Sequence, residues 1–115
     1  MQTQLHNQWT TICKKEDLTA NAGICAQFND EQVAIFFDKR NNALYALANF
    51  DPFGQANVIS RGIIGSTEDI VYVASPLYKQ RFNLQTGECL ESPVHALKIY
   101  PIRFENDEVQ LKRAS

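Results

Sequence analysis

Three cysteines and two histidines are the side chains in this sequence best suited to chemistry, because thiolates and imidazoles bind metals and act as nucleophiles or bases. They stand far apart, at Cys13, Cys25, Cys89, His6 and His95, and Cys89 and His95 form the nearest pair. Structural zinc sites use tight clusters such as Cys-x2-4-Cys, and the sequence has none. We therefore expect the cysteines to be small buried residues of strands and the histidines to be solvated. The odd, widely spaced cysteines also argue against a disulfide framework and favour a reducing compartment.

The other candidate chemistries are weaker. The carboxylates fall in predicted turns, where they are solvated, so the sequence offers no acid–base pair for hydrolysis. The glycines of Gly62-Ile63-Ile64-Gly65 are followed closely by no lysine and no helix start, so they do not form a phosphate loop. A stand-alone enzyme would need a pocket in which polar groups converge, and the sequence indicates none.

Length and composition narrow the class of protein. The 115 residues predict a single domain over 1–115, with Trp9 to Arg113 as the folded part. Eleven basic and thirteen acidic residues give a net charge of -2, without the basic excess of a nucleic-acid-binding protein. No apolar stretch approaches the ~18 residues of a membrane span. The first nine residues lack the basic and apolar segments of a secretory signal, so we expect a cytoplasmic protein.

Short strands separated by turns at ~8–12-residue spacing predict an all-β sandwich or barrel. The predicted strands are 9–13, 24–28, 33–37, 43–48, 70–74, 80–84, 88–90, 97–104 and 109–112. One helical turn is expected around Glu16 to Leu18, and 49–60 is expected to be a loop. The continuous apolar run 70–74 predicts a strand covered on both faces. The predicted core comprises Trp9, Ile12, Ile35, Phe37, Leu47, Val71, Val73, Phe82, Leu97 and Ile99.

Two of the segments between these strands carry a family resemblance. The first, 48–54, reads Ala-Asn-Phe-Asp-Pro-Phe-Gly, and the second, 74–88, runs from Ala-Ser-Pro-Leu-Tyr into Phe-Asn-Leu-Gln-Thr-Gly. Together they resemble the two cluster-binding loops of the Rieske iron–sulfur domain, which bring Cys-x-His and Cys-x-x-His to the metal. The resemblance extends from about Trp9 to Arg113. It implies a Rieske-like domain of small antiparallel sheets, with the two loops at one end.

All four ligand positions of that family differ in this sequence. Asp51 and Phe53 stand at the first Cys and His, and Ser75 and Tyr78 at the second pair. Phe53 has no donor atom, and the hydroxyls of Ser75 and Tyr78 do not ionise readily near neutral pH. One carboxylate does not hold a cluster, so the resemblance implies a Rieske scaffold without its [2Fe-2S] cluster and with no metal of its own.

This combination is similar to the small subunit of bacterial NAD(P)H-dependent, assimilatory-type nitrite reductase, and 58–65 also resembles that family. In that family the large subunit carries FAD, sirohaem and an iron–sulfur cluster. The resemblance implies that this chain is non-catalytic itself and assists the large subunit in reducing nitrite to ammonium. A cluster-free interaction module of another reductase or oxygenase is the alternative, because a fold alone does not fix the partner.

Two roles are open for the substituted loops. Phe53, Leu77 and Tyr78 could fill the cluster space by apolar packing, while Asp51 and Ser75 bond loop backbone amides. Alternatively, the loops form the partner interface, because aromatic residues and arginine are favoured anchors at interfaces. The interface candidates are Phe53, Arg61, Leu77 and Tyr78.

Overall fold

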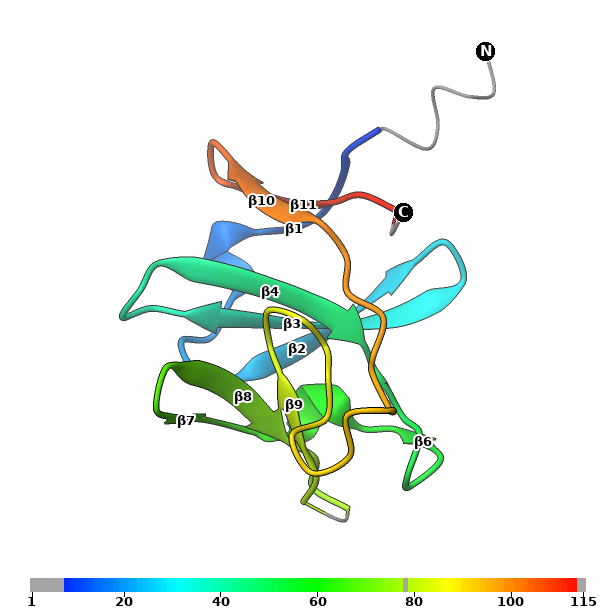
Figure 1. Cartoon of the computed structure of the whole chain (residues 1–115). Coiled ribbons are helices and arrows are strands. Elements are labelled where there is room, and N and C mark those ends of the chain that lie inside the picture. Colours follow the sequence, from blue (N-terminus) through cyan, green and yellow to red (C-terminus); the bar gives the residue numbers. More distant parts are fainter. Residues whose placement is uncertain (1–7, 78, 114–115) are drawn as a thin grey trace.

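The computed structural model describes residues 8–77 and 79–113, whose strands form four small antiparallel sheets (Figure 1). One sheet has the order β1-β11-β10, with bounds Thr10–Lys14, Glu108–Leu111 and Ile102–Glu105. The next joins β2, β3 and β4, which cover Gly23–Phe28, Glu31–Asp38 and Ala43–Ala48. A third pairs β5 with β6, at Phe50–Asp51 and Ala56–Asn57. The last joins β7, β8 and β9, at Ile63–Thr67, Ile70–Ala74 and Arg81–Asn83. The predicted all-β, Rieske-like architecture of small antiparallel sheets is confirmed.

The β2-β3-β4 sheet lies between the other two three-stranded sheets, with β1, β10 and β11 on one side and β7, β8 and β9 on the other (Figure 1). Its central strand, β3, therefore packs on both faces. Val33 and Ile35 point into one buried cluster and Ala34 and Phe36 into the other, and all four are 0% exposed. The prediction that 70–74 is covered on both faces is wrong, because β8 lies in an outer layer and has only Val73 fully buried.

Tight turns fix the register of the middle sheet. Asn29 and Asp30, at φ 50° and 66°, connect β2 to β3, and two consecutive residues with positive φ are typical of the hairpin turn that fits twisted strands. Asn42, at φ 51°, closes the turn between β3 and β4. Both turns agree with the sequence prediction, because asparagine and aspartate tolerate this left-handed backbone.

Several predicted boundaries are wrong. The expected loop 49–60 contains β5, β6 and the first two residues of a short 3-10 helix, η3, at Ile59–Arg61. Segment 88–90 pairs through isolated bridges and is no strand, and only the second half of 97–104 is a strand. The first half instead runs antiparallel along the edge of β4, through a bridge between Leu47 and Ile99. The helical turn expected near Glu16 is the 3-10 helix η2, at Lys15–Asp17.

The core is partly as predicted. Five predicted core residues are buried, namely Ile35, Leu47, Val73, Phe82 and Leu97. Four others are half-buried, namely Trp9, Ile12, Phe37 and Val71. The assignment of Ile99 to the core is wrong. Its side chain is 40% exposed, because it lies in the segment that runs along the outer edge of β4. Along β3 the fully buried aromatic residue is Phe36 rather than Phe37.

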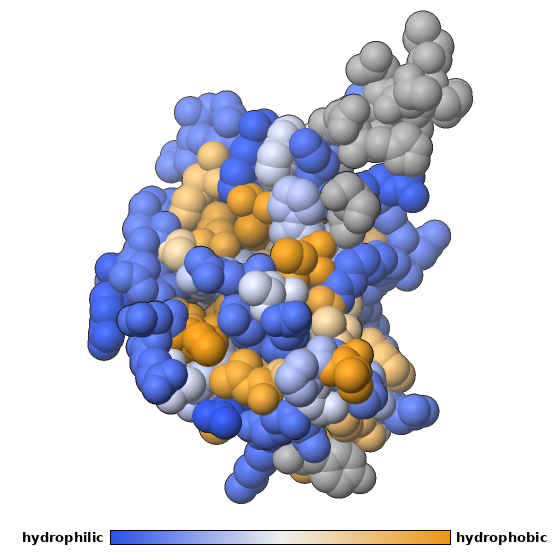
Figure 2. All heavy atoms as spheres, in the orientation of Figure 1, coloured by the Kyte–Doolittle hydropathy of each residue, from blue (hydrophilic) through white to orange (hydrophobic). Residues whose placement is uncertain are grey.

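Hydrophilic side chains predominate on the surface seen in Figure 2, and apolar side chains are exposed between them in separate patches. Among the described residues, no helix is long and apolar enough to cross a membrane.

Candidate functional site

The two loops that carry the family resemblance lie at one end of the domain, away from β1 and β11 (Figure 1). The two loops have equivalent backbone hydrogen bonds and dihedral angles. The amide of Gln55 donates to the carbonyl of Asp51 at 2.7 Å, and the amide of Lys79 donates to the carbonyl of Ser75 at 3.0 Å. Gln55 and Lys79 both have positive φ, at 56° and 63°, and in each loop a proline follows the first residue. Residues 51–55 (the first loop) and the described residues of 75–79 (the second loop) are thus closed by the same kind of hydrogen bond.

A buried polar pair joins the two loops. Asp51 is 0% exposed and Ser75 is 1% exposed, and the Ser75 hydroxyl donates a hydrogen bond to Oδ2 of Asp51. Asp51 Oδ1 accepts from the amide of Phe53 at 2.8 Å, and Ser75 Oγ accepts from the amide of Leu77 at 3.4 Å. Buried polar atoms need such partners, since an unpaired one costs about 1–3 kcal/mol. The prediction that Asp51 and Ser75 bond loop backbone amides is confirmed.

Apolar side chains close the space around this pair. The half-buried ring of Phe53 lies 6.2 Å from the ring of Phe82, centroid to centroid. Leu77 covers Gly54, where an added Cβ would come within 2.3 Å of Leu77 Cδ1. Glycine at 54 therefore allows the second loop to lie directly on the first. Tyr78, the third residue expected in this packing, falls outside the described residues.

His95 joins the site from a distant part of the chain. Its ring centroid lies 4.7 Å from that of Phe53, and its Nδ1 lies 2.9 Å from Ser92 Oγ. The side chain is exposed, as predicted, but it is not merely solvated, because one face packs on Phe53. No local sequence signal indicates this contact, which depends on the path of segment 92–97 around the loops. His6, the other histidine, lies outside the described residues.

Asn49 was missed as a positioning residue and holds the base of the first loop. It is 1% exposed, and its Oδ1 accepts the amide of Ser60 at 2.7 Å while its Nδ2 donates to Gln32 at 3.1 Å. Its carbonyl also accepts the amide of Ile59 at 3.1 Å. These bonds tie the first loop to η3, where Arg61 is exposed.

The cysteines lie outside both loops, and only part of the prediction for them is confirmed. Cys89 is buried, Cys13 is half-buried and Cys25 is exposed. Cys25 was expected to be buried, but β2 is an edge strand of the middle sheet and its residues 25 and 27 face outward. Desolvation raises the pKa of the Cys13 and Cys25 thiols, which weakens them as nucleophiles. Within residues 8–77 and 79–113, no group of three or more Cys, His, Asp or Glu side chains is arranged to hold a metal ion.

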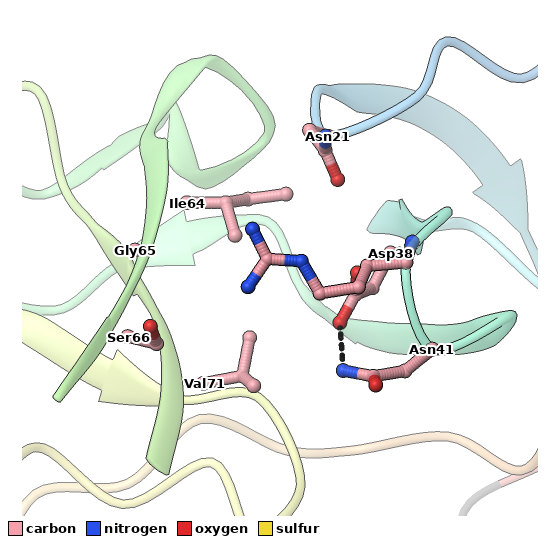
Figure 3. A pocket seen from close by; sticks show the side chains of 8 residues that line it. Asn21, Asp38, Asn41, Ile64, Gly65, Ser66 and Val71 are labelled. Atoms are coloured by element: carbon pink, nitrogen blue, oxygen red, sulfur yellow. Dashed lines mark hydrogen bonds between the residues drawn. The ribbon is translucent and has the colours of Figure 1, made fainter. Parts of the chain in front are cut away.

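A separate pocket of about 250 Å³ lies between the β3–β4 turn and the β7–β8 hairpin (Figure 3). Its lining comprises Asn21, Asp38, Arg40, Asn41, Ile64, Gly65, Ser66 and Val71. The Asp38 carboxylate is used by the turn itself, since it accepts from the Arg40 amide at 3.1 Å and from Asn41 Nδ2 at 2.8 Å. The lining contains no histidine, cysteine or lysine, so it offers no nucleophile–base pair.

The layered all-β fold and the paired loops define a Rieske-like domain, and the sequence matches the Rieske-like [2Fe-2S] domain family over residues 8–112. The chain is 42% identical over 106 residues to the nitrite reductase (NADH) small subunit of Escherichia coli (strain K12), covering 92% of this chain and 98% of that one. It superimposes with a TM-score of 0.78 on the nitrite reductase [NAD(P)H] small subunit of Erwinia carotovora, with 41% identity, covering 93% of this chain and 82% of that chain. The chain therefore belongs to the family of nitrite reductase (NADH) small subunits.

A longer relative contains the same domain. The nitrite reductase [NAD(P)H] large subunit of Klebsiella oxytoca is 37% identical over 101 residues, which are 88% of this chain and 10% of that protein. A domain of this type thus also occurs within a chain about ten times as long as the matched segment.

Proposed function

We propose that this chain is a cluster-free accessory subunit of an NAD(P)H-dependent nitrite reductase, which assists a cytoplasmic large subunit in reducing nitrite to ammonium. The observation that carries the proposal is the buried pair formed by Asp51 and Ser75. These two residues occupy the positions at which the resemblance to Rieske domains calls for thiolate ligands.

The side chains at these positions do not fit a [2Fe-2S] cluster. Rieske centres use two thiolates and two imidazoles. Asp51 and Ser75 bond each other and the amides of Phe53 and Leu77, so their oxygens are committed within the loops. Phe53 has only a hydrocarbon ring, which packs against Phe82. A phenol such as that of Tyr78 is a hard oxygen donor, whereas Rieske clusters are held by thiolates and imidazoles.

The partner follows from the family and from the longer Klebsiella oxytoca relative, in which such a domain is part of a large-subunit chain. Covalent linkage in one protein favours non-covalent association of the corresponding chains in another. The FAD, sirohaem and iron–sulfur cluster expected for the reaction then belong to the large subunit. No step of the chemistry is assigned to this chain.

The loops are the proposed partner interface, with Phe53, Arg61, Leu77 and Tyr78 as contact residues. Aromatic and arginine side chains bury much area for little conformational entropy, which makes them favoured anchors. The exposure of Leu77, at 45%, and of Arg61 supports a role in contacts beyond this chain.

The test is nitrite-dependent NADH oxidation by the purified holo large subunit, measured with and without this chain. We expect the chain to increase either the rate or the lifetime of activity at elevated temperature. Equal rates and equal lifetimes, together with no co-purification, would refute the proposal. Co-purification with a different reductase or oxygenase instead would support the alternative interaction module.

A further inference from the structure

Three segments that are distant in sequence form one apolar surface at the loop end, which we call the tip surface: Phe53 from the first loop, Leu77 from the second, and Val94 with His95 from the segment before β10. The rings of Phe53 and His95 are in contact, with centroids 4.7 Å apart and planes tilted by 51°, and Leu77 lies over Gly54, next to Phe53 in the chain. Val94, adjacent to His95, is 89% exposed, more than the other exposed large apolar side chains of the described residues. Singly exposed apolar side chains are ordinary, whereas exposed apolar side chains that gather in one patch are typical of interaction surfaces.

The tip surface contains no Asp, Glu, Lys or Arg. The neighbouring prolines, Pro76 and Pro93, are exposed and add uncharged surface beside it. Along the chain, the flanking acidic and basic residues are Asp51, Lys79 and Glu91. Asp51 is buried and bonded to Ser75, and Glu91 is paired with Arg81 at 2.6 Å. An apolar centre bordered by polar residues is the usual composition of a protein interface, whose centre is depleted of charge.

The terminal strands lie away from the tip surface. β1 and the end of β11 lie at the opposite end of the domain from the two loops (Figure 1). In the Klebsiella oxytoca relative the matched segment is one tenth of a large-subunit chain, so a domain of this kind is connected there to the rest of the protein. If that connection leaves from the terminal end, the loop end still faces outward and can dock on the same chain.

We infer that the tip surface docks on an uncharged, apolar face of the nitrite reductase large subunit, with Val94 as an anchor contributed by a segment outside the two Rieske-type loops. The inference rests on the proposed function, since it takes the large subunit as the partner. Standard interfaces bury about 800 Å² on each partner and involve about 20–30 residues a side, far more than the four residues of the tip surface. We therefore take the tip surface as the centre of the contact and the surrounding polar residues as its rim.

The experiment is a calorimetric titration of the holo large subunit with this chain and its variants, which measures the Kd of each. Val94→Asp places a charge at the centre of the contact, and we expect the Kd to rise at least about tenfold. The matched control is Ile63→Asp, which makes the same kind of change at another highly exposed aliphatic residue, 75% exposed, in β7. We expect its Kd to stay within about twofold of the wild type. Circular dichroism and thermal unfolding confirm that both variants fold.

Salt provides a second measurement. The tip surface is uncharged, and Arg61 is the one charged residue among the proposed contacts. Because screening acts on charges and an exposed ion pair contributes at most about 1 kcal/mol, we expect the Kd to change less than about fivefold between low salt and 0.5 M NaCl. A Val94→Asp variant that binds like the wild type, an Ile63→Asp variant that is weakened equally, or a steep salt dependence would each overturn the inference. Failure of the wild-type chain to bind the large subunit would instead overturn the proposed function, so the two failures are distinguishable.

Discussion

The first and second loops each have a proline at their second position and a residue with positive φ at their fifth. Their other side chains make different contacts. In the first loop Asp51 accepts two hydrogen bonds at a fully buried position, and Phe53 packs inward on Phe82. In the second loop Ser75 supplies one hydroxyl with a longer amide contact of 3.4 Å, and Leu77 remains 45% exposed. The first loop therefore supplies most of the contacts that hold this end of the domain together, and the second supplies the more exposed apolar side chain.

This difference shows how a loop pair that resembles a metal site can be stable without metal–ligand bonds. The Asp51 carboxyl group bonds to residues of both loops, and the Phe53 ring packs on Phe82 beside the first loop. Stability should then depend on the first loop more than on the second. Four substitutions test this division, from the largest expected effect to the smallest.

Asp51→Ala should have the largest effect on folding. It leaves the Ser75 hydroxyl and the Phe53 amide without their partner in a buried site. We expect the free energy of unfolding to fall by about 3 kcal/mol, measured by urea denaturation. Asp51→Asn is the matched control, because its side-chain oxygen can still accept from the Phe53 amide, and it should cost clearly less. Equal losses for the two variants would contradict the role of the hydrogen bonds.

Phe53→Ala should come next. The half-buried ring contacts Phe82 and His95, so its removal loses part of the about 3–5 kcal/mol typical of a fully buried phenylalanine. We expect a loss of about 2 kcal/mol in the same denaturation experiment. Phe53→Leu keeps apolar volume at the position and should recover about half of the loss. A loss below that of Leu77→Ala would reverse the proposed division between the loops.

Ser75→Ala should lower the free energy of unfolding by about 1.5 kcal/mol. The substitution removes the hydroxyl that donates to Oδ2 of Asp51, so this buried oxygen loses a hydrogen bond. The amide of Leu77 loses only a long contact at 3.4 Å. A cost equal to that of Asp51→Ala would show that the pair acts as one unit. The double variant then settles the coupling, since additive losses indicate independent contributions.

Leu77→Ala should have the smallest effect on stability, under about 1 kcal/mol, because nearly half of the side chain is already in water. Its effect on association with the large subunit should be larger than its effect on folding. Measuring the Kd and the urea midpoint on the same preparation separates the two. A variant that is strongly destabilised, yet binds normally, would assign the second loop to folding.

The sequence indicated much of this site because the relevant signals are local. Asp51 and Ser75 each precede a proline, and such residues commonly bond amides two positions on, as both do. The turn at Asn29 was predictable for the same reason, since asparagine tolerates positive φ.

The parts that could not be predicted depend on layers and on distant contacts. Phe36 and Ile35 are both buried because β3 lies between two sheets, a relation that no local pattern records. Cys25 is exposed because β2 is an edge strand, although its sequence resembles that of a buried one. The ring contact between His95 and Phe53 depends on how the chain returns past the loops.

The central claim is that the loops hold the domain together through Asp51 and Phe53 and bind no cluster. The most direct measurement is the iron content and visible spectrum of the chain after anaerobic incubation with iron, sulfide and a thiol reductant, followed by desalting. We predict a colourless protein with no bound iron and an unchanged urea midpoint. Stoichiometric iron and sulfide, with visible absorption that decreases on reduction and an increased urea midpoint, would show that the loops bind a cluster.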